Sequence, residues 1–261
     1  MHAFAYSTPS SVADASAAAA QEDSKFIAGG QTLLHSMKLG LIAPSTVIDL
    51  SGIPELKGIF RDGNAIVIGA GTTHADVAAS KDVQQAIPAL AELAGHIGDR
   101  QVRNRGTLGG SLANNDPAAC YPAAVLGLGA TVTTNQRKIA AEDFFVGVYT
   151  TALNEGEVIT SVSFPIPEKA GWQKFKQPAS RFSLVGVFVS KGPAGVRVAV
   201  TGAGANGVFR AAGLEDKLAT NWSAAAMSGA TVSAGGLNSD LHGSADYRAA
   251  LIPVLTGRAV G

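Results

Sequence analysis

The chain concentrates residues suited to binding an anion in one segment, residues 101–111. Arg103 and Arg105 lead into a run that holds three glycines and two hydroxyl side chains, and an Asn-Asn-Asp-Pro sequence follows at 114–117. Glycine permits positive φ angles and lets a ligand approach the backbone closely, because it has no Cβ. Successive exposed N–H groups in such a turn form a concave anion site. The segment therefore predicts a loop that binds a negatively charged group.

A second segment of the same kind lies upstream, at residues 28–32 (Ala-Gly-Gly-Gln-Thr), directly after a short apolar stretch at 25–27. A helix expected at 32–37 would direct its N-terminus at this loop, a geometry that favours phosphate. Together, the two segments predict a ligand with a pyrophosphate at its centre, held from both sides. For either segment alone an ordinary turn is the alternative, because the chain has 31 glycines and glycine is common in loops.

Other familiar binding and catalytic patterns are missing. Neither glycine segment has the spacing G-x-G-x-x-G or G-x-x-x-x-G-K-[ST], which disfavours a dinucleotide-binding Rossmann fold and a P-loop. The five histidines show no H-x-x-x-H or H-E-x-x-H spacing, so a zinc site is not expected. Ser111 lies in no G-x-S-x-G sequence, which disfavours a serine hydrolase. We therefore predict no catalytic residue and no metal ligand on this chain.

Composition narrows the class of protein. Hydrophobic residues make up 46% of the 261 residues, and charged residues only 15%, against about a quarter in ordinary globular domains. This deficit of charge suggests a subunit whose surface is partly covered, although a chain rich in alanine and glycine gives a similar figure. The net charge is zero and there is no basic block, which argues against nucleic-acid binding.

The sequence also restricts where the protein is found in the cell and which redox centres the chain can hold. There is no run of about 18 apolar residues, so no transmembrane helix is expected. The N-terminal residues lack the basic start and apolar centre of a signal peptide, and we expect a cytoplasmic protein. The single cysteine, Cys120, cannot hold an iron–sulfur cluster, which takes about four ligands. If electrons pass through this chain, any metal centre must lie on another chain.

Hydrophobic periodicity, caps and turn residues predict a mixture of helices and strands. Helices are expected at residues 10–21, 32–37, 75–80, 88–94, 211–219, 223–227 and 244–255. Strands are expected at 25–27, 46–50, 65–69, 130–134, 158–164, 182–190 and 196–201, the last two forming a hairpin. The second glycine segment is expected to be a loop, residues 122–127 a short apolar piece and 228–238 a loop. Prolines at 165 and 167 mark a boundary.

The glycine segments and the sequence around them resemble the FAD-binding medium subunit of the molybdenum hydroxylases, as found in carbon monoxide dehydrogenases and bacterial aldehyde or xanthine dehydrogenases. The matching stretches occur in the family's order along nearly the whole chain. They are residues 28–34, 37–38, 48–50, 69–74 (Gly-Ala-Gly-Thr-Thr-His), 101–111, 116–119 (Asp-Pro-Ala-Ala), 144–145, 156–159, 164–165, 175–176, 181–185 and 247–251.

This resemblance implies an α+β fold. A two-lobed FAD-binding domain of the vanillyl-alcohol-oxidase-like type would occupy residues 1–54 (lobe 1) and 55–167 (lobe 2). A small C-terminal domain, a short antiparallel sheet with helices, would follow at 168–261.

The resemblance also implies which residues contact FAD. Residues 28–34 and 107–111 would wrap its pyrophosphate and ribityl chain, Ile97 would pack on the flavin, and Lys176 would lie near the isoalloxazine. Ile159 would supply a backbone or apolar contact. The implied FAD-binding residues are Ala28, Gly29, Gly30, Gln31, Thr32, Leu33, Leu34, Thr73, Ile97, Thr107, Gly109, Gly110, Ser111, Asp116, Cys120, Ile159 and Lys176.

Several of these assignments have a simpler alternative. Lys176 follows aromatic residues and would be an ordinary solvated lysine, and Arg105 would be a loop anchor or salt-bridge partner. His74 and His96 lie near glycine-containing loops, where a satisfied loop histidine is the alternative to a ligand contact. The family commonly carries an acidic residue where this chain has Cys120, so FAD binding would weaken there or the role would pass to Asp116.

In function, the resemblance implies an electron-transfer subunit of a three-part molybdenum hydroxylase. Substrate would be oxidised at a molybdenum cofactor on a large chain, and electrons would pass through [2Fe–2S] clusters on a small chain to FAD on this chain and then to an external acceptor. The assembly would be a dimer of heterotrimers. Two alternatives are a stand-alone flavin oxidase of the vanillyl-alcohol-oxidase class and a non-catalytic nucleotide-binding module.

Overall fold

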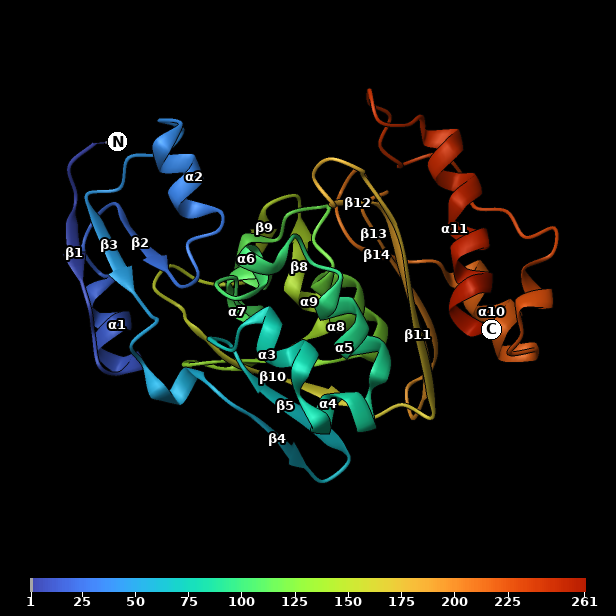
Figure 1. Cartoon of the computed structure of the whole chain (residues 1–261), viewed down its shortest axis with the longest axis horizontal. Coiled ribbons are helices and arrows are strands. Elements are labelled where there is room, and N and C mark those ends of the chain that lie inside the picture. Colours follow the sequence, from blue (N-terminus) through green and yellow to red (C-terminus); the bar gives the residue numbers. More distant parts are fainter. Residues whose placement is uncertain (1) are drawn as a thin grey trace.

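The computed structural model describes residues 2–261 and contains three main β-sheets that follow one another along the chain (Figure 1). The first is a parallel sheet of three strands in the order β1-β3-β2. Parallel neighbours need crossover connections, which here contain helices. The elements are β1 (Ala5–Ser7), α1 (Val12–Ala18), β2 (Ser24–Ile27), α2 (Leu33–Lys38) and β3 (Thr46–Asp49).

The helix α1 shows how local sequence fixes this part of the fold. Ser11 precedes the helix in an extended conformation, and its side chain accepts a hydrogen bond from the Asp14 N–H. Such a cap satisfies one of the backbone donors that a helix start leaves free. Val12 and Ala15 lie on the buried face and pack with β3 in a small core.

The second sheet is antiparallel and has five strands in the order β4-β5-β10-β6-β7. Its strands are β4 (Ile59–Asp62), β5 (Ala65–Gly69), β6 (Thr131–Thr134), β7 (Lys138–Ala140) and β10 (Ile159–Pro165). The helical segments around it are η1 (Pro54–Leu56), α3 (His74–Ala79), α4 (Lys81–Ala86), α5 (Pro88–Gly95), α6 (Arg100–Arg103), α7 (Leu108–Asn114), α8 (Tyr121–Leu128) and α9 (Ala141–Phe144). A two-stranded ribbon is formed by β8 (Phe145–Gly147) and β9 (Thr150–Thr151).

The helix α8 lies at the centre of the molecule (Figure 1). All eight of its residues are buried, and it contacts α5, α7 and the strands β12 and β13 of the third sheet. A helix that is apolar all round is stable only when it is enclosed by other elements. The apolar sequence of α8 therefore explains its central place, because only an enclosed position removes every face of the helix from water.

The third sheet is antiparallel, in the order β11-β12-β13-β14, and α11 packs on it at the right of Figure 1. Arg248 of α11 is buried and donates to the carbonyl oxygens of Leu184 (2.7 Å) and Gly202 (3.0 Å) and to both oxygens of Asp240 (2.8 Å each). These bonds tie the helix to the sheet. The elements are β11 (Lys169–Lys176), β12 (Ser183–Gly192), β13 (Gly195–Thr201), β14 (Phe209–Arg210), α10 (Ala212–Thr220), η2 (Ala224–Met227) and α11 (Ala245–Val260).

The expected mixture of sheets and helices is confirmed, as are the seven expected strands, the hairpin between β12 and β13, and the helices around residues 12–18, 88–95 and 212–220. The expectation of a loop at the second glycine segment is wrong, because residues 108–114 form α7. Strands β1, β4, β7, β8, β9, β11 and β14 were missed. They are short or carry charged residues that hide the alternation of a strand. The last helix is longer than expected and continues past Pro253 to Val260.

Gly171 in β11 offers a test of the packing between the third sheet and α11. A Cβ at this position would overlap the carbonyl oxygen of Ala259. We expect Gly171→Ala to lower the free energy of unfolding by about 1–3 kcal/mol, because overpacking forces backbone shifts. Gly213 in α10 is the matched control, since a Cβ there meets no heavy atom beyond its own helix; Gly213→Ala should stabilise by up to about 1 kcal/mol. Urea unfolding followed by circular dichroism measures both, and equal stabilities would contradict the packing argument.

Candidate functional site

The first glycine segment forms an open loop between β2 and α2. Among the described residues, the N–H groups of Gly29, Gly30, Gln31 and Thr32 form no hydrogen bond. Gly30 has φ = +70°, a conformation that favours glycine. Backbone donors in folded proteins are nearly always paired with protein or water. Four consecutive free donors in one loop therefore form a cradle that suits the oxygens of an anion.

The two glycine segments are in direct contact with each other. Gly29 packs so closely on the other segment that a Cβ at this position would overlap the carbonyl oxygen of Arg105 and lie 2.8 Å from Cα of Gly106. Only glycine fits such a backbone-to-backbone approach. The cradle is thereby held against the part of the chain that begins α7.

The second glycine segment is built differently from the first, because the amides of residues 108–111 are already hydrogen-bonded within the protein. Thr107 caps α7 and accepts from Gly110 N–H at 3.2 Å, while the Gly109 N–H donates to Ala70 O at 2.8 Å. A Cβ at Gly109 would lie 2.6 Å from Cβ of Ala70. Gly109 is therefore needed for packing against the turn after β5, not for an open loop.

Free donors near this segment come from a neighbouring pair of threonines. Thr73 and Thr107 form an isolated antiparallel bridge, in which the His74 N–H donates to Gly106 O and the Leu108 N–H donates to Thr72 O. The N–H groups of Thr73 and Thr107 themselves have no acceptor among residues 2–261. Both threonines are among the predicted FAD-binding residues.

His74 lies behind this bridge and is almost fully buried, at 4% exposure. Burial, with a smaller contribution from the charge of Arg103, lowers the pKa of His74 to about 4. Its ring contacts the buried ring of Tyr121 at 5.3 Å between centroids. Neither His74 Nδ1 nor the Tyr121 hydroxyl has a hydrogen-bond partner within the described chain. His74 is thus a buried, neutral histidine under the glycine segment.

Lys174 of β11 reaches the loop between α5 and α6. Its Nζ donates to His96 O at 3.0 Å and lies 3.3 Å from Cys120 Sγ. Cys120 is buried and also lies 3.6 Å from Ser183 Oγ. Ile97, in the same loop, is half-buried. The structure thus brings the predicted residues Ile97 and Cys120 to one place.

Lys176, the lysine that the family resemblance implied, is exposed and forms no side-chain hydrogen bond or ion pair in the described part of the chain. A β-bulge between Phe175 and Lys176 shifts the pairing of β11 with β12. A bulge changes the direction of the side chains that follow it. The structure therefore places Lys174, which the sequence analysis missed, beside Cys120, and leaves Lys176 in solvent. Which of these two lysines of β11 lies beside Cys120 becomes clear only when the strand and its bulge are known.

Asp116 is held by the protein itself. Its Oδ1 accepts from the Ala118 N–H at 2.8 Å, and its Oδ2 accepts from the Tyr149 hydroxyl at 3.3 Å. Burial raises the pKa of Tyr149, and the neighbouring Asp116 adds to this effect. Tyr149 has φ = +53°, uncommon for a bulky residue, and its N–H donates to Asn115 O at 3.2 Å. Sequence analysis missed Tyr149, because nothing local in the sequence marks this conformation.

The remaining predicted FAD-binding residues lie around the first loop, in α7 and in the main core. Ala28, Leu33 and Leu34 are half-buried around the first loop, and Ser111 is half-buried in α7. Ile159 starts β10 with its side chain in the main core, at 5% exposure. Only the backbone of Ile159 is then available to a ligand.

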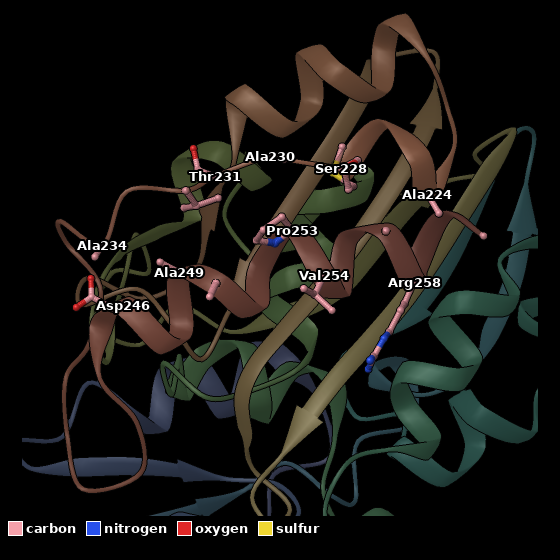
Figure 2. A pocket seen from close by; sticks show the side chains of 16 residues that line it. Ala224, Ser228, Ala230, Thr231, Ala234, Asp246, Ala249, Pro253, Val254 and Arg258 are labelled. Carbon is pink, nitrogen blue, oxygen red and sulfur yellow. The ribbon is translucent and has the colours of Figure 1, made fainter.

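A separate groove of about 990 Å³ lies in the C-terminal part of the chain, along α11 and the loop after η2 (Figure 2). Its walls are mostly small and apolar, with Asp246 and Arg258 toward opposite ends of α11. None of the predicted FAD-binding residues lines it. Within residues 2–261 there is also no cluster of three His, Cys, Asp or Glu side chains that could hold a metal ion, and no helix long and apolar enough to cross a membrane.

Residues 2–167 match the family described as the FAD binding domain in molybdopterin dehydrogenase. The chain belongs to this family. It is 37% identical to the medium subunit of nicotine 6-hydroxylase from Paenarthrobacter nicotinovorans, over 99% of this chain and 96% of that protein. It is 35% identical to the medium chain of carbon monoxide dehydrogenase from Hydrogenophaga pseudoflava, over 98% and 96% of the two chains.

Solved structures agree with the family. Carbon monoxide dehydrogenase from Hydrogenophaga pseudoflava superposes with a TM-score of 0.87 at 34% identity, covering 99% of this chain and 96% of that one. Quinoline 2-oxidoreductase from Pseudomonas putida 86 gives a TM-score of 0.87 at 31% identity with the same coverage. The resemblance inferred from the sequence, the oxidoreductase class and FAD as the cofactor of the family are thereby confirmed, and the roles of single residues stay predictions.

The buried state of His74 predicts a pH dependence of stability. Because its pKa is about 4 in the folded chain and about 6.5 when unfolded, protons bind preferentially to the unfolded state as the pH falls below about 6.5. Stability should therefore decline between about pH 6.5 and pH 4. His74→Phe, which removes the titrating group, should give a shallower decline, whatever its stability at neutral pH. His242→Phe, at an exposed position, is the control. The measurement is the urea unfolding midpoint as a function of pH across this range. If the midpoint falls with pH at the same slope in the wild type and both variants, His74 has no role in the pH dependence.

Proposed function

We propose that this chain is the FAD-binding electron-transfer subunit of a heterotrimeric molybdenum hydroxylase. It would accept electrons from [2Fe–2S] clusters on a small partner chain and pass them through FAD to an external acceptor, while a large chain holds the molybdenum cofactor. The names "medium subunit" and "medium chain" of the relatives support a place between a small and a large partner. The observation that carries the proposal is the cradle of four free amides, because a pyrophosphate needs such donors.

The donors present fit FAD. The N–H groups of residues 29–32 would hold the pyrophosphate, within the contact segment 28–34 that the sequence implied, and those of Thr73 and Thr107 would add donors from the second lobe. Thr107–Ser111 would then act as a rigid wall, because α7 already uses its other amides. When bound, the flavin supplies the redox chemistry, and the protein supplies binding, orientation and electrostatics.

The finer architecture belongs to the same proposal. Residues 1–54 and 55–167 would be the two lobes of a vanillyl-alcohol-oxidase-like FAD domain, and 168–261 the C-terminal domain. This division is supported by the three sheets, each of which lies within one of these ranges. The working assembly would be a dimer of heterotrimers in the cytoplasm.

The cradle can be tested with two glycines that share one backbone conformation. Gly30 has φ = +70° and Gly40, in the turn after α2, has φ = +73°. Both Gly30→Ala and Gly40→Ala should cost about 1 kcal/mol or more of stability through backbone strain. Only Gly30→Ala should reduce FAD affinity, by tenfold or more, because its backbone strain falls within the run of free amides and its Cβ crowds the Leu34 side chain, whereas a Cβ at Gly40 meets open space.

FAD affinity is measured by titrating the apoprotein and following flavin fluorescence, and the cofactor of the purified protein is released by heat and identified by chromatography. FMN in place of FAD, or no flavin, would refute the proposal. Equal loss of affinity in both glycine variants would show that strain, not the cradle, controls binding.

The subunit role has its own test. The complete complex is reduced with its substrate under anaerobic conditions, and the flavin absorbance is followed; the experiment is repeated with this chain alone. We expect the flavin to bleach in the complex and to stay oxidised in the isolated chain, because the electrons must come through the partner chains. Flavin reduction by substrate in the isolated chain would instead indicate a stand-alone flavin oxidase.

A further inference from the structure

His74 lies behind the candidate site, and its ring is in close contact with Gly106 of the second glycine segment. A Cβ at Gly106 would lie 2.6 Å from His74 Nε2 and 2.9 Å from His74 Cδ2. Side chains are not found at such distances, so only glycine fits against the ring. The φ angle of Gly106 is not positive. The contact with His74, and not the backbone conformation, therefore requires glycine at this position.

Gly106 is also in contact with the first glycine segment. A Cβ at Gly29 would lie 2.8 Å from Gly106 Cα, and the run of free amides at residues 29–32 begins at this contact. The imidazole ring and the amide cradle thus both pack on the same residue. Because both contacts are too close to admit a side chain, a shift of Gly106 would be passed on to the cradle.

The ring of His74 is itself held by packing. It is 4% exposed, and its centroid lies 5.3 Å from that of the Tyr121 ring. Tyr121 is the first residue of α8, the helix that is buried on all sides. Neither His74 Nδ1 nor the Tyr121 hydroxyl has a hydrogen-bond partner within residues 2–261, so packing and not a polar partner fixes the ring. Contacts thus run without a gap from α8 through Tyr121 and His74 to Gly106.

The backbone of His74 is tied to Gly106 as well. The His74 N–H donates to Gly106 O at 3.0 Å. Thr73, directly before it, caps α3 by accepting from the Asp76 N–H at 3.1 Å. The start of α3 therefore fixes both the backbone and the ring of the one residue that contacts Gly106 twice.

We propose that His74 is a positioning residue for the amide cradle: its imidazole ring supports Gly106 and so fixes the free amides of residues 29–32 relative to the second glycine segment. This inference rests on the proposed function, because the ligand concerned is the pyrophosphate of FAD. A ring that is 4% exposed does not reach a ligand itself, so its effect passes through Gly106. Donors that are already in place bind an anion more tightly, since no loop has to be ordered on binding.

The test is a double-mutant cycle in FAD affinity, measured by titrating the full-length apoprotein with FAD and following flavin fluorescence. Gly106→Ala should weaken binding, because its Cβ overlaps the ring and displaces the backbone that contacts Gly29. His74→Ala should weaken binding by removing the support. In the double variant the new methyl group occupies space that the ring has left. The double variant should therefore bind FAD about tenfold more tightly than the product of the two single losses predicts.

A cavity elsewhere in the core separates this role from a general loss of stability. Val83 in α4 is fully buried, and α4 lies well away from α6 and α7 (Figure 1). Val83→Ala should lower the free energy of unfolding in urea, as His74→Ala does, yet keep the wild-type affinity for FAD. If Gly106→Ala does not fold, the comparison of His74→Ala with Val83→Ala decides alone. If His74→Ala does not fold, His74→Val, which leaves a smaller cavity, takes its place.

The outcomes separate this inference from the proposed function. If the wild-type chain binds no FAD, the proposed function fails. If the wild type binds FAD and His74→Ala keeps the same affinity, or the two single losses simply multiply in the double variant, only the role of His74 is refuted. An equal loss of affinity in Val83→Ala would also overturn that role, because FAD affinity would then follow stability.

Discussion

The close contact between Gly29 and the backbone at Arg105 is the constraint on which the candidate site depends. It joins the loop after β2, in the first sheet, to the segment that starts α7 on the second sheet. Because no side chain fits between the two backbones, the free amides of the first loop are held in a fixed place. Arg103, in α6 directly before this contact, then reaches the loop of residues 96–98. Along the chain, the short helix α6 thus lies between the loop of residues 96–98 and the segment that contacts the amide cradle.

The chain uses its basic residues in two ways. Arg248 is buried with Asp240, and Arg210 is paired with Glu215, so these cations hold the C-terminal sheet and helices together. Lys174 and Arg103 bond instead to backbone carbonyls. Pairing a cation with a carboxylate cancels its field, whereas a carbonyl only orients it.

Beneath the site lies a rigid apolar support. The helix α8 is enclosed on all sides and begins directly after Cys120, and His74 and Tyr121 fill the space under the second glycine segment. Holding His74 neutral keeps a further charge out of this layer. Close packing of this kind limits the movement of the loops above it. The same buried histidine thus packs against the glycine segment and accounts for the predicted acid sensitivity.

The sequence by itself determined the family, the mixed fold and the position of the first glycine loop. These follow from short-range signals: glycine pairs, caps such as Ser11, and apolar periodicity. It did not determine the second segment correctly, because Gly109 and Gly110 look like a loop until Thr107 caps them into α7 and Ala70 packs against Gly109. Only the tertiary structure distinguished Lys174 from Lys176, since a bulge in β11 and the long-range contact with Cys120 place Lys174 beside that thiol and leave Lys176 exposed. Contacts between residues far apart in sequence depend on how the sheets pack, and no local pattern encodes them.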